Sequence, residues 1–337
     1  MVPLRIDFSA PAMVRYWLQR DGNFSDSPLV NAGVIIGGMN PVTVNLFDSG
    51  SYFTIAPAAR QMPNVTVYVK KSPVLLTILL DGSPVVEESA PLAWNDFSSW
   101  QTLTRDVARF SPGLTAEHFF GGGMQHGHFA HRDTTITIGV DYNWDENGHP
   151  NGVPFYISSA GYGVLRNTWA PGQYAFNSPV IATHNESHRF DAFFMIANNS
   201  IPTSLKTLVG LYTQLTGTPF LPPLYGLFLG DSDCYHNDRH GNSTQVAITI
   251  GQLYNTHDMP VGWLLPNDGY GCGYGEGPAV FPSNLTDLTY VVSRLHEEGL
   301  YVGLWTSTGM PHIKDEVGVA GTRVCKTDVG WIGDGYS

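Results

Sequence analysis

The chain has 337 residues, which is long for one ordinary domain and favours two. Its 29 acidic and 17 basic residues give a net charge of −12, which argues against nucleic-acid binding and is compatible with a neutral ligand such as a sugar. No apolar stretch reaches the roughly 18 residues that a membrane-spanning helix needs.

The first part of the chain, to about residue 198, has the pattern of a β-rich domain. Residues alternate between apolar and polar over Val65–Val69 and Thr134–Val140, as in strands with one buried face. A continuous apolar run, Leu75–Leu80, leads into the turn Asp81-Gly82. Short strands separated by Gly, Pro and Asn turns predict a large β-sandwich, which we place at residues 1–218 together with a linking helix.

Near Ser200 the pattern changes to helices that alternate with strands. The linking helix has apolar residues at helical spacing from Ile201 to Leu215 and ends at Gly217. Strands are then expected at Tyr225–Leu229, Val261–Leu265, Leu300–Trp305 and Val324–Thr327, with helices around 246–253 and 285–295. Buried strands that alternate with helices predict a parallel sheet. Because a complete (β/α)₈ barrel takes about 250 residues, residues 219–337 are expected to hold its first four strands, with the remainder absent from this chain.

A lysine and an aspartate stand at the end of the fourth expected strand. Lys326 and Asp328 are two positions apart, so their side chains would project to the same side of that strand. Barrel enzymes keep their chemistry at the C-terminal ends of the strands, which makes Asp328 a candidate catalytic carboxylate. The Lys326 ammonium would favour its ionised form. The alternative is a Lys–Asp ion pair that caps the strand.

Several short segments, in order and at suitable spacing, together resemble glycoside hydrolase family 31, the retaining α-glucosidases, α-xylosidases and α-glucosyltransferases. In the barrel part the similar segments are Pro222–Leu227, Met259–Leu264, Phe281-Pro282 with Glu298–Gly303, and Lys326–Asp328. In the first part they are Glu117–Gly123, Pro154–Ser159 and Gly161–Leu165, which resemble the family's galactose-mutarotase-like sandwich. The Gly121–Gln125 and Gly161–Thr168 segments look most like the branch with bacterial α-glucosyltransferases that build α-1,3 and α-1,6 links.

The resemblance implies a role for several of these residues. Asp328 would be the nucleophile, and the acid/base aspartate would come from a later barrel segment, beyond Ser337. Asp268, after the second strand, would hold sugar hydroxyls in the cleaved subsite. The local pattern departs from the usual family form there, so Asn267 is an alternative equivalent, and a turn aspartate before Gly269 is the structural alternative. The family implies no cofactor and no metal.

Four further residues are weaker candidates for contacts with substrate. Asp231 follows the first expected strand and would contact sugar or stabilise its loop. Trp305 and Trp331 would form apolar walls for a sugar ring, with a core tryptophan as the alternative. Asp145, beside Trp144, lies in the sandwich loop that reaches over the pocket in the family.

Two local patterns are interpreted as structural. His126, His128 and His131 match no metal-site spacing, so we expect solvated loop histidines. Gly121–Gly123 lacks the Gly-Lys-Ser/Thr ending of a phosphate-binding loop.

Glycosylation motifs and cysteines indicate a secreted protein. Six Asn-x-Ser/Thr sites occur, at Asn23, Asn64, Asn185, Asn198, Asn242 and Asn284. Met1–Arg5 lacks the apolar core of a signal peptide, so a processed N-terminus is expected. Of three cysteines, Cys234 and Cys272 follow adjacent barrel strands and are expected to form a disulfide, which leaves Cys325 as a buried thiol.

Taken together, the chain is expected to be the N-terminal portion of a secreted, retaining α-glycoside-processing enzyme. A second polypeptide, the C-terminal fragment of the same precursor, would complete the barrel. The sequence leaves hydrolysis and transfer of the sugar both open. A catalytically inactive carbohydrate-binding or scaffold protein is the competing hypothesis.

Overall fold

Two compact units, Met1–Pro219 and Phe220–Ser337, make up the chain, and each is described by itself. The structure is a computed structural model that describes residues 3–36, 42–59, 63–107, 115–139, 141, 148–197, 203–233, 245–266 and 282–303. Among the helices of these residues, none is both long and apolar enough to span a bilayer.

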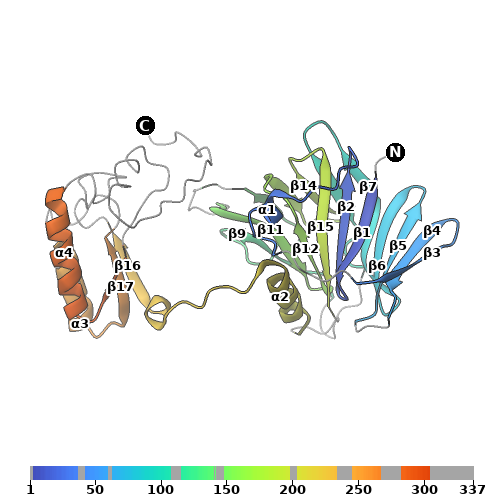
Figure 1. Cartoon of the computed structure of the whole chain (residues 1–337). Coiled ribbons are helices and arrows are strands. Elements are labelled where there is room, and N and C mark those ends of the chain that lie inside the picture. Colours follow the sequence, from blue (N-terminus) through green and yellow to red (C-terminus); the bar gives the residue numbers. More distant parts are fainter. Residues whose placement is uncertain are drawn as a thin grey trace. The chain divides into compact units, whose positions relative to one another are not determined.

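One layer of the first unit is a six-stranded antiparallel sheet (Figure 1). The central strand β15 is buried along its whole length, which means that both of its faces are covered. In sheet order the strands are β1 (Leu4–Ala10), β2 (Met13–Gln19), β15 (Arg189–Ile196), β12 (Tyr162–Arg166), β11 (Asn151–Ser158) and β9 (Phe119–Met124).

The second layer is a nine-stranded antiparallel sheet. Its order is β10 (Thr135–Ile138), β13 (Gly172–Ala175), β14 (Val180–His184), β8 (Ser99–Leu103), β7 (Ser83–Trp94), β6 (Val74–Leu80), β5 (Val65–Lys71), β4 (Tyr52–Pro57) and β3 (Val44–Asp48). The alternation expected at Val65–Val69 is present in β5, where Val65, Val67 and Val69 are buried and Tyr68 is exposed.

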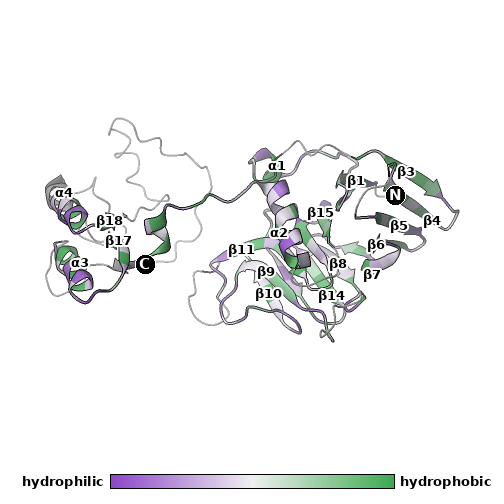
Figure 2. Cartoon of the chain, turned by 90° about the horizontal axis from the view of Figure 1, so that it is seen from below, coloured by the Kyte–Doolittle hydropathy of each residue, from purple (hydrophilic) through white to green (hydrophobic). Residues whose placement is uncertain are grey.

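The core of the first unit lies between the two sheets. One buried cluster combines residues of β2 and β15, such as Tyr16 and Phe190, with residues of the other layer, such as Val67 and Ile78. The Tyr16 and Phe190 rings meet edge to face with centroids 5.6 Å apart. Green, apolar stretches recur along the strands of both layers in Figure 2. The predicted β-sandwich is therefore confirmed, because alternating apolar faces of two antiparallel sheets enclose one core.

A helix covers the other face of the six-stranded sheet. Helix α2 (Thr203–Thr216) buries Leu208, Leu211 and Leu215, and its Tyr212 ring stacks on Phe155 of β11 at 4.2 Å. These leucines join a second apolar cluster that includes residues of β15 and Leu29 of the short helix α1 (Pro28–Asn31). The chain leaves α2 through Gly217, whose φ of +90° suits glycine at a helix end.

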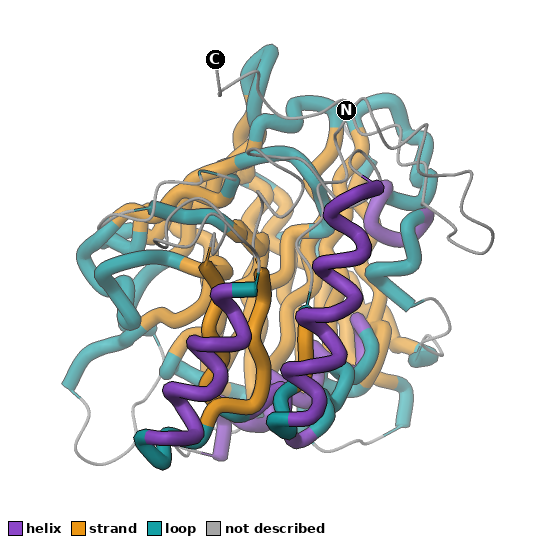
Figure 3. The backbone as a smooth tube through the Cα atoms, turned by 90° about the vertical axis from the view of Figure 1, so that its left-hand side faces the viewer, coloured by secondary structure: helices purple, strands orange, loops and turns teal. Residues whose placement is uncertain are grey.

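The second unit has the α/β pattern that the sequence predicts. Strands β16 (Leu229–Asp233), β17 (Val261–Pro266) and β18 (Tyr301–Val302) form a parallel sheet in that order, and helices α3 (Val246–Thr256) and α4 (Pro282–Glu297) run beside it (Figure 3). Its core contains Ala247 of α3, Leu264 of β17 and Leu295 of α4. The β-sandwich followed by an α/β unit confirms the predicted fold class, while the fourth expected strand lies outside the described residues.

The first strand of this unit begins later than expected. Leu224–Leu227 form a 3₁₀ turn (η1), in which the Gly226 amide donates to the Pro223 carbonyl at 2.9 Å. Pro222 and Pro223 have fixed φ angles and no amide hydrogen for a sheet, which favours a turn after them. As a result Asp231 lies within β16 rather than after the strand.

Candidate functional site

Of the predicted substrate and catalytic residues, only Asp231 lies in the described part of the chain. Its carboxylate Oδ2 accepts a 3.0 Å hydrogen bond from the Tyr254 hydroxyl of α3. In the parallel register Asp231 faces Leu264 of β17, near the C-terminal end of the sheet. The contact with Tyr254 fixes the strand end against the helix, and a contact of Asp231 with sugar stays a prediction.

The other predicted site residues lie outside the described residues. They are Asp145, Asp268, Trp305, Lys326, Asp328 and Trp331, together with Asn267 and Trp144. The three cysteines, Cys234, Cys272 and Cys325, also lie outside them, so their pairing stays a prediction.

In the first unit, the segment that follows β9 lines a cavity of about 630 Å³ that is open to solvent. β9 contains three consecutive glycines before its last residue, Gly121, Gly122 and Gly123, with φ angles of +116°, +80° and +84°. A Cβ on Gly123 would lie 1.9 Å from the Asn151 carbonyl oxygen, so only glycine allows this approach to β11. The cavity is lined by Gly121, Gly123, Met124, Gln125, His126, Gly127, His128, Phe129 and His131.

Hydrogen bonds from side chains to the backbone hold this segment in place. The Gln125 amide nitrogen donates to the carbonyls of Gly122 and Thr137, both at 3.0 Å. The His131 Nε2 lies 3.0 Å from the Gly121 carbonyl, which can only accept, so Nε2 carries the proton. Burial also lowers the pKa of His131, which favours the neutral ring.

The three histidines of this segment do not share one environment. His128 is exposed and His126 is half-buried, whereas His131 is only 2% exposed and its ring stacks on Phe176. The expectation of a solvated loop histidine is therefore wrong for His131, because it packs into the sandwich beneath the loop. The described residues contain no group of three or more His, Cys, Asp or Glu side chains that could hold a metal ion.

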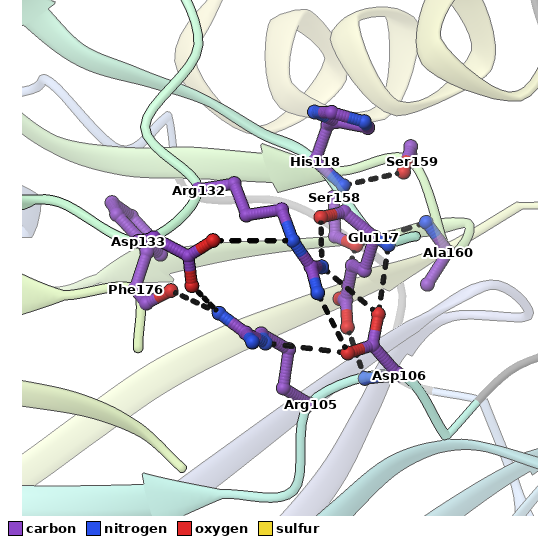
Figure 4. Close-up of polar contacts among 10 residues, drawn as sticks. All are labelled: Arg105, Asp106, Glu117, His118, Arg132, Asp133, Ser158, Ser159, Ala160 and Phe176. Carbon is purple, nitrogen blue, oxygen red and sulfur yellow. Dashed lines mark hydrogen bonds and ion pairs between the residues drawn. The ribbon is translucent and has the colours of Figure 1, made fainter. Parts of the chain in front are cut away.

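A network of charged groups around the buried Glu117 lies at the base of the same segment (Figure 4). Glu117 is 1% exposed, accepts a 2.7 Å hydrogen bond from the Asp106 amide and takes another from the Ser158 hydroxyl. In return the Glu117 amide donates to Asp106 Oδ1 at 2.8 Å. Burial raises the pKa of Glu117, and the Ser158 and Asp106 hydrogen bonds only partly oppose that rise.

Arg132 joins the two ends of the segment. Its guanidinium donates to both carboxylate oxygens of Asp106, at 3.0 and 3.2 Å, and to the Glu117 carbonyl at 2.6 Å. Burial by itself would raise the pKa of Asp106, but the hydrogen bonds from Arg132 and the Glu117 amide outweigh it and lower that pKa. Arg105 adds a bond to Asp133 and one to the Phe176 carbonyl at 3.0 Å. The network therefore clamps Glu117, just before β9, to Arg132, just after the cavity.

Replacing Arg132 with alanine should lower the free energy of unfolding by about 1.5–3 kcal/mol, because it removes charged hydrogen bonds and leaves Asp106 beside the buried Glu117. Chemical denaturation would measure the loss. Arg5→Ala is the matched control, because Arg5 pairs with Asp7 while 54% exposed and should cost less than about 1 kcal/mol. Equal losses in the two variants would contradict a clamp at this position.

No sequence pattern indicates this network apart from Glu117, which belongs to one of the motifs that resemble the family. The hydrogen bonds described above join residues 11 to 71 positions apart, and no local spacing marks such pairs. Two aspartates of the network share one local feature. Asp106 and Asp133 have φ angles of +64° and +61°, a conformation that Asp tolerates better than most residues.

Comparisons with known proteins give a consistent result. The "Glycosyl hydrolase 31 N-terminal galactose mutarotase-like domain" matches residues 3–174. An alpha-xylosidase of Emericella nidulans is 25% identical over 209 residues, which cover 56% of this chain and 24% of that protein.

Solved structures show the same fold. A GH31 dextranase of Flavobacterium johnsoniae superimposes with a TM-score of 0.71 at 17% identity, over 90% of this chain and 36% of its own. A GH31 alpha-xylosidase from a soil metagenome gives a TM-score of 0.69 at 16% identity, over 94% of this chain and 47% of its own. The chain thus spans between 24% and 47% of the length of these relatives. Because the family domain covers more than half of its 337 residues, the chain belongs to glycoside hydrolase family 31 and contains that family's N-terminal galactose-mutarotase-like domain.

Proposed function

We propose that this chain is part of a retaining α-glycoside-processing enzyme that acts on α-linked sugars through a covalent glycosyl–enzyme intermediate. The observation that carries the proposal is membership of the family together with a parallel α/β unit after the sandwich. Relatives of similar fold include an alpha-xylosidase in complex with xylose and a dextranase in complexes with isomaltotriose and with glucose. An α-linked xyloside or glucoside is therefore the substrate class proposed for this protein.

The proposed reaction assigns one carboxylate to attack and one to proton transfer. The Asp328 carboxylate attacks the anomeric carbon, the glycosidic bond breaks, and a protonated carboxyl gives its proton to the departing oxygen. In the second step the same carboxyl, now a base, takes a proton from water or from a sugar hydroxyl, which attacks the anomeric carbon and releases Asp328. Retention requires the two carboxyl groups to lie roughly 5–5.5 Å apart.

The remaining predicted site residues would bind and orient the sugar. Asp268, or Asn267 in its place, would accept hydrogen bonds from ring hydroxyls. Lys326 would keep Asp328 ionised by charge attraction. Trp305 and Trp331 would contact the apolar face of the ring, and Asp145 would approach from the sandwich loop.

We also propose that further barrel strands, on a second polypeptide from the same precursor, pair with the second unit. The first strand of that unit begins at Leu229, which is 53% exposed, and Phe228 just before it is 49% exposed. An apolar, unpaired strand edge is a surface that proteins normally cover. The much greater length of the relatives is consistent with such strands.

Activity can be tested with a panel of aryl α-glycosides of xylose, glucose, galactose and N-acetylgalactosamine. Release of the aryl group from one of them, with retained anomeric configuration in the first-formed sugar, would support the proposal. Product analysis in the presence of an acceptor sugar separates hydrolysis from transfer. Binding of an α-linked oligosaccharide without turnover of any glycoside would instead favour an inactive carbohydrate-binding protein.

Secretion is proposed from the glycosylation motifs. Asn23, Asn64 and Asn185 are exposed in the structure, as an acceptor asparagine must be. In an oxidising compartment Cys234 and Cys272 would form a disulfide.

The proposed disulfide predicts the number of reactive thiols in the chain. Thiol counting on the denatured chain, without reductant, should find one reactive group, that of Cys325, because the other two sulfurs are joined. Adding reductant before the assay should raise the count to three and serves as the control. Three thiols without reductant would contradict the pairing.

A further inference from the structure

The cavity that follows β9 has no part in the chemistry proposed above. It is formed by one continuous segment, Gly121–His131, and has a volume of about 630 Å³, within the range of small-molecule pockets. Phe129 is 86% exposed at its rim, and its only ring neighbour among the described residues is Phe120, with centroids 5.5 Å apart. Met124 is 47% exposed beside it. The exposed Phe129 ring therefore presents apolar surface to solvent.

The chemistry of the lining indicates the class of ligand. The nine described lining residues include no carboxylate, ammonium or guanidinium group. They do include the imidazoles of His126 and His128, which can donate or accept hydrogen bonds. An apolar ring beside a few polar groups suits a neutral molecule that has both an apolar face and hydroxyl groups, and a sugar ring has both.

Hydrogen bonds also hold the cavity segment in one conformation, so it does not have to become ordered when a ligand binds. Gln125 ties its start to the carbonyls of Gly122 and Thr137, and His131 ties its end to Gly121. Below it, Arg132 binds the Glu117 carbonyl at 2.6 Å. A site that is ordered before binding loses less conformational entropy when the ligand arrives.

We propose that this cavity is an accessory carbohydrate-binding site, in which a sugar unit of a neutral α-linked oligosaccharide stacks on Phe129 and hydrogen-bonds to His126 and His128. The choice of an α-linked oligosaccharide rests on the proposed function. Every described lining residue belongs to the first unit.

Isomaltotriose titrated into the full chain tests the proposal. Its binding should shift the imidazole resonances of His126 and His128 in proton–carbon correlation spectra. Phe129→Ala should weaken this binding at least tenfold, and Phe129→Trp should keep or strengthen it. Phe97→Ala is the matched control, because Phe97 is 80% exposed in the turn between β7 and β8 and should leave the affinity unchanged.

The same variants separate this proposal from the proposed function. Turnover of a 4-nitrophenyl α-xyloside or α-glucoside, which carries a single sugar, should be unaffected by Phe129→Ala. Sugar binding that depends on Phe129, without turnover of any glycoside by the chain assembled with its second polypeptide, would support the accessory site and contradict the enzyme. Turnover without any shift at His126 and His128, or binding of cyclohexanol but not of isomaltotriose, would overturn the accessory site.

Discussion

Replacing Asp328 with asparagine is expected to lower turnover of the active protein by several orders of magnitude. The amide cannot attack the anomeric carbon, so no covalent glycosyl–enzyme intermediate forms, and the first chemical step loses its nucleophile. The folded structure should be retained, since the substitution keeps the shape of the side chain. Steady-state kinetics on the preferred aryl glycoside, with circular dichroism as a check on folding, would measure both.

A matched substitution should have no such effect. Asp258 is exposed in the turn between α3 and β17, at the opposite end of the sheet from the strand ends that carry the site, and Asp258→Asn should leave turnover unchanged. A 2-fluoro glycoside should label Asp328 and no other carboxylate. Labelling elsewhere, or near-normal turnover in Asp328→Asn, would show that another residue is the nucleophile.

The contribution of His184 to the stability of the first unit should fall steeply in acid. The His184 Nδ1 lies 2.8 Å from the Ala170 carbonyl, so it carries the proton, and its Nε2 accepts a 2.8 Å hydrogen bond from the Tyr174 hydroxyl. Burial, followed by the charge of Arg166, lowers the pKa of His184 from 6.5 to about 3. The folded ring therefore stays neutral at a pH where the ring of the unfolded chain is charged.

The sign of the effect follows from proton binding. Below pH 6.5 the unfolded chain takes up a proton that the folded chain does not, so the free energy of unfolding decreases as pH falls towards about 3. Each pH unit in that window costs about 1.4 kcal/mol, or roughly 3 kcal/mol by pH 4. Above pH 6.5 the contribution is fully present. Urea denaturation at a series of pH values would measure the slope.

His184→Gln should reduce the number of protons taken up on unfolding by about one, which flattens that slope. His188→Gln, in the exposed turn nearby, should not change it. Glu88 acts in the opposite direction, because burial raises its pKa to about 7, so its contribution is lost as pH rises. Comparing each variant with the parent chain removes the Glu88 contribution. A His184 ring resonance that titrates near pH 6.5 in the folded protein would contradict the prediction, even if the glutamine variant fails to fold.

The strands and helices could largely be predicted from the sequence, because their signals are local. The alternation in Val65–Val69 places Val65, Val67 and Val69 on one buried face whatever the partner strand is. The helical spacing that ends at Leu215 likewise marks one face of α2. The start of β16 was missed, since the apolar residues from Tyr225 to Leu229 fit a strand equally well until the turn after Pro223 is known.

The sequence by itself determined the fold class, the order of the two units and a candidate nucleophile, Asp328, because periodicity and short motifs are carried by neighbouring residues. Only the tertiary structure decided that His131 is buried, that Tyr254 holds Asp231, and that Glu117 and Arg132 clamp the cavity segment. The physical reason is that burial and charge pairing depend on residues far apart in the chain. Arg15 and Asp191, which form two hydrogen bonds across 176 positions, are an example.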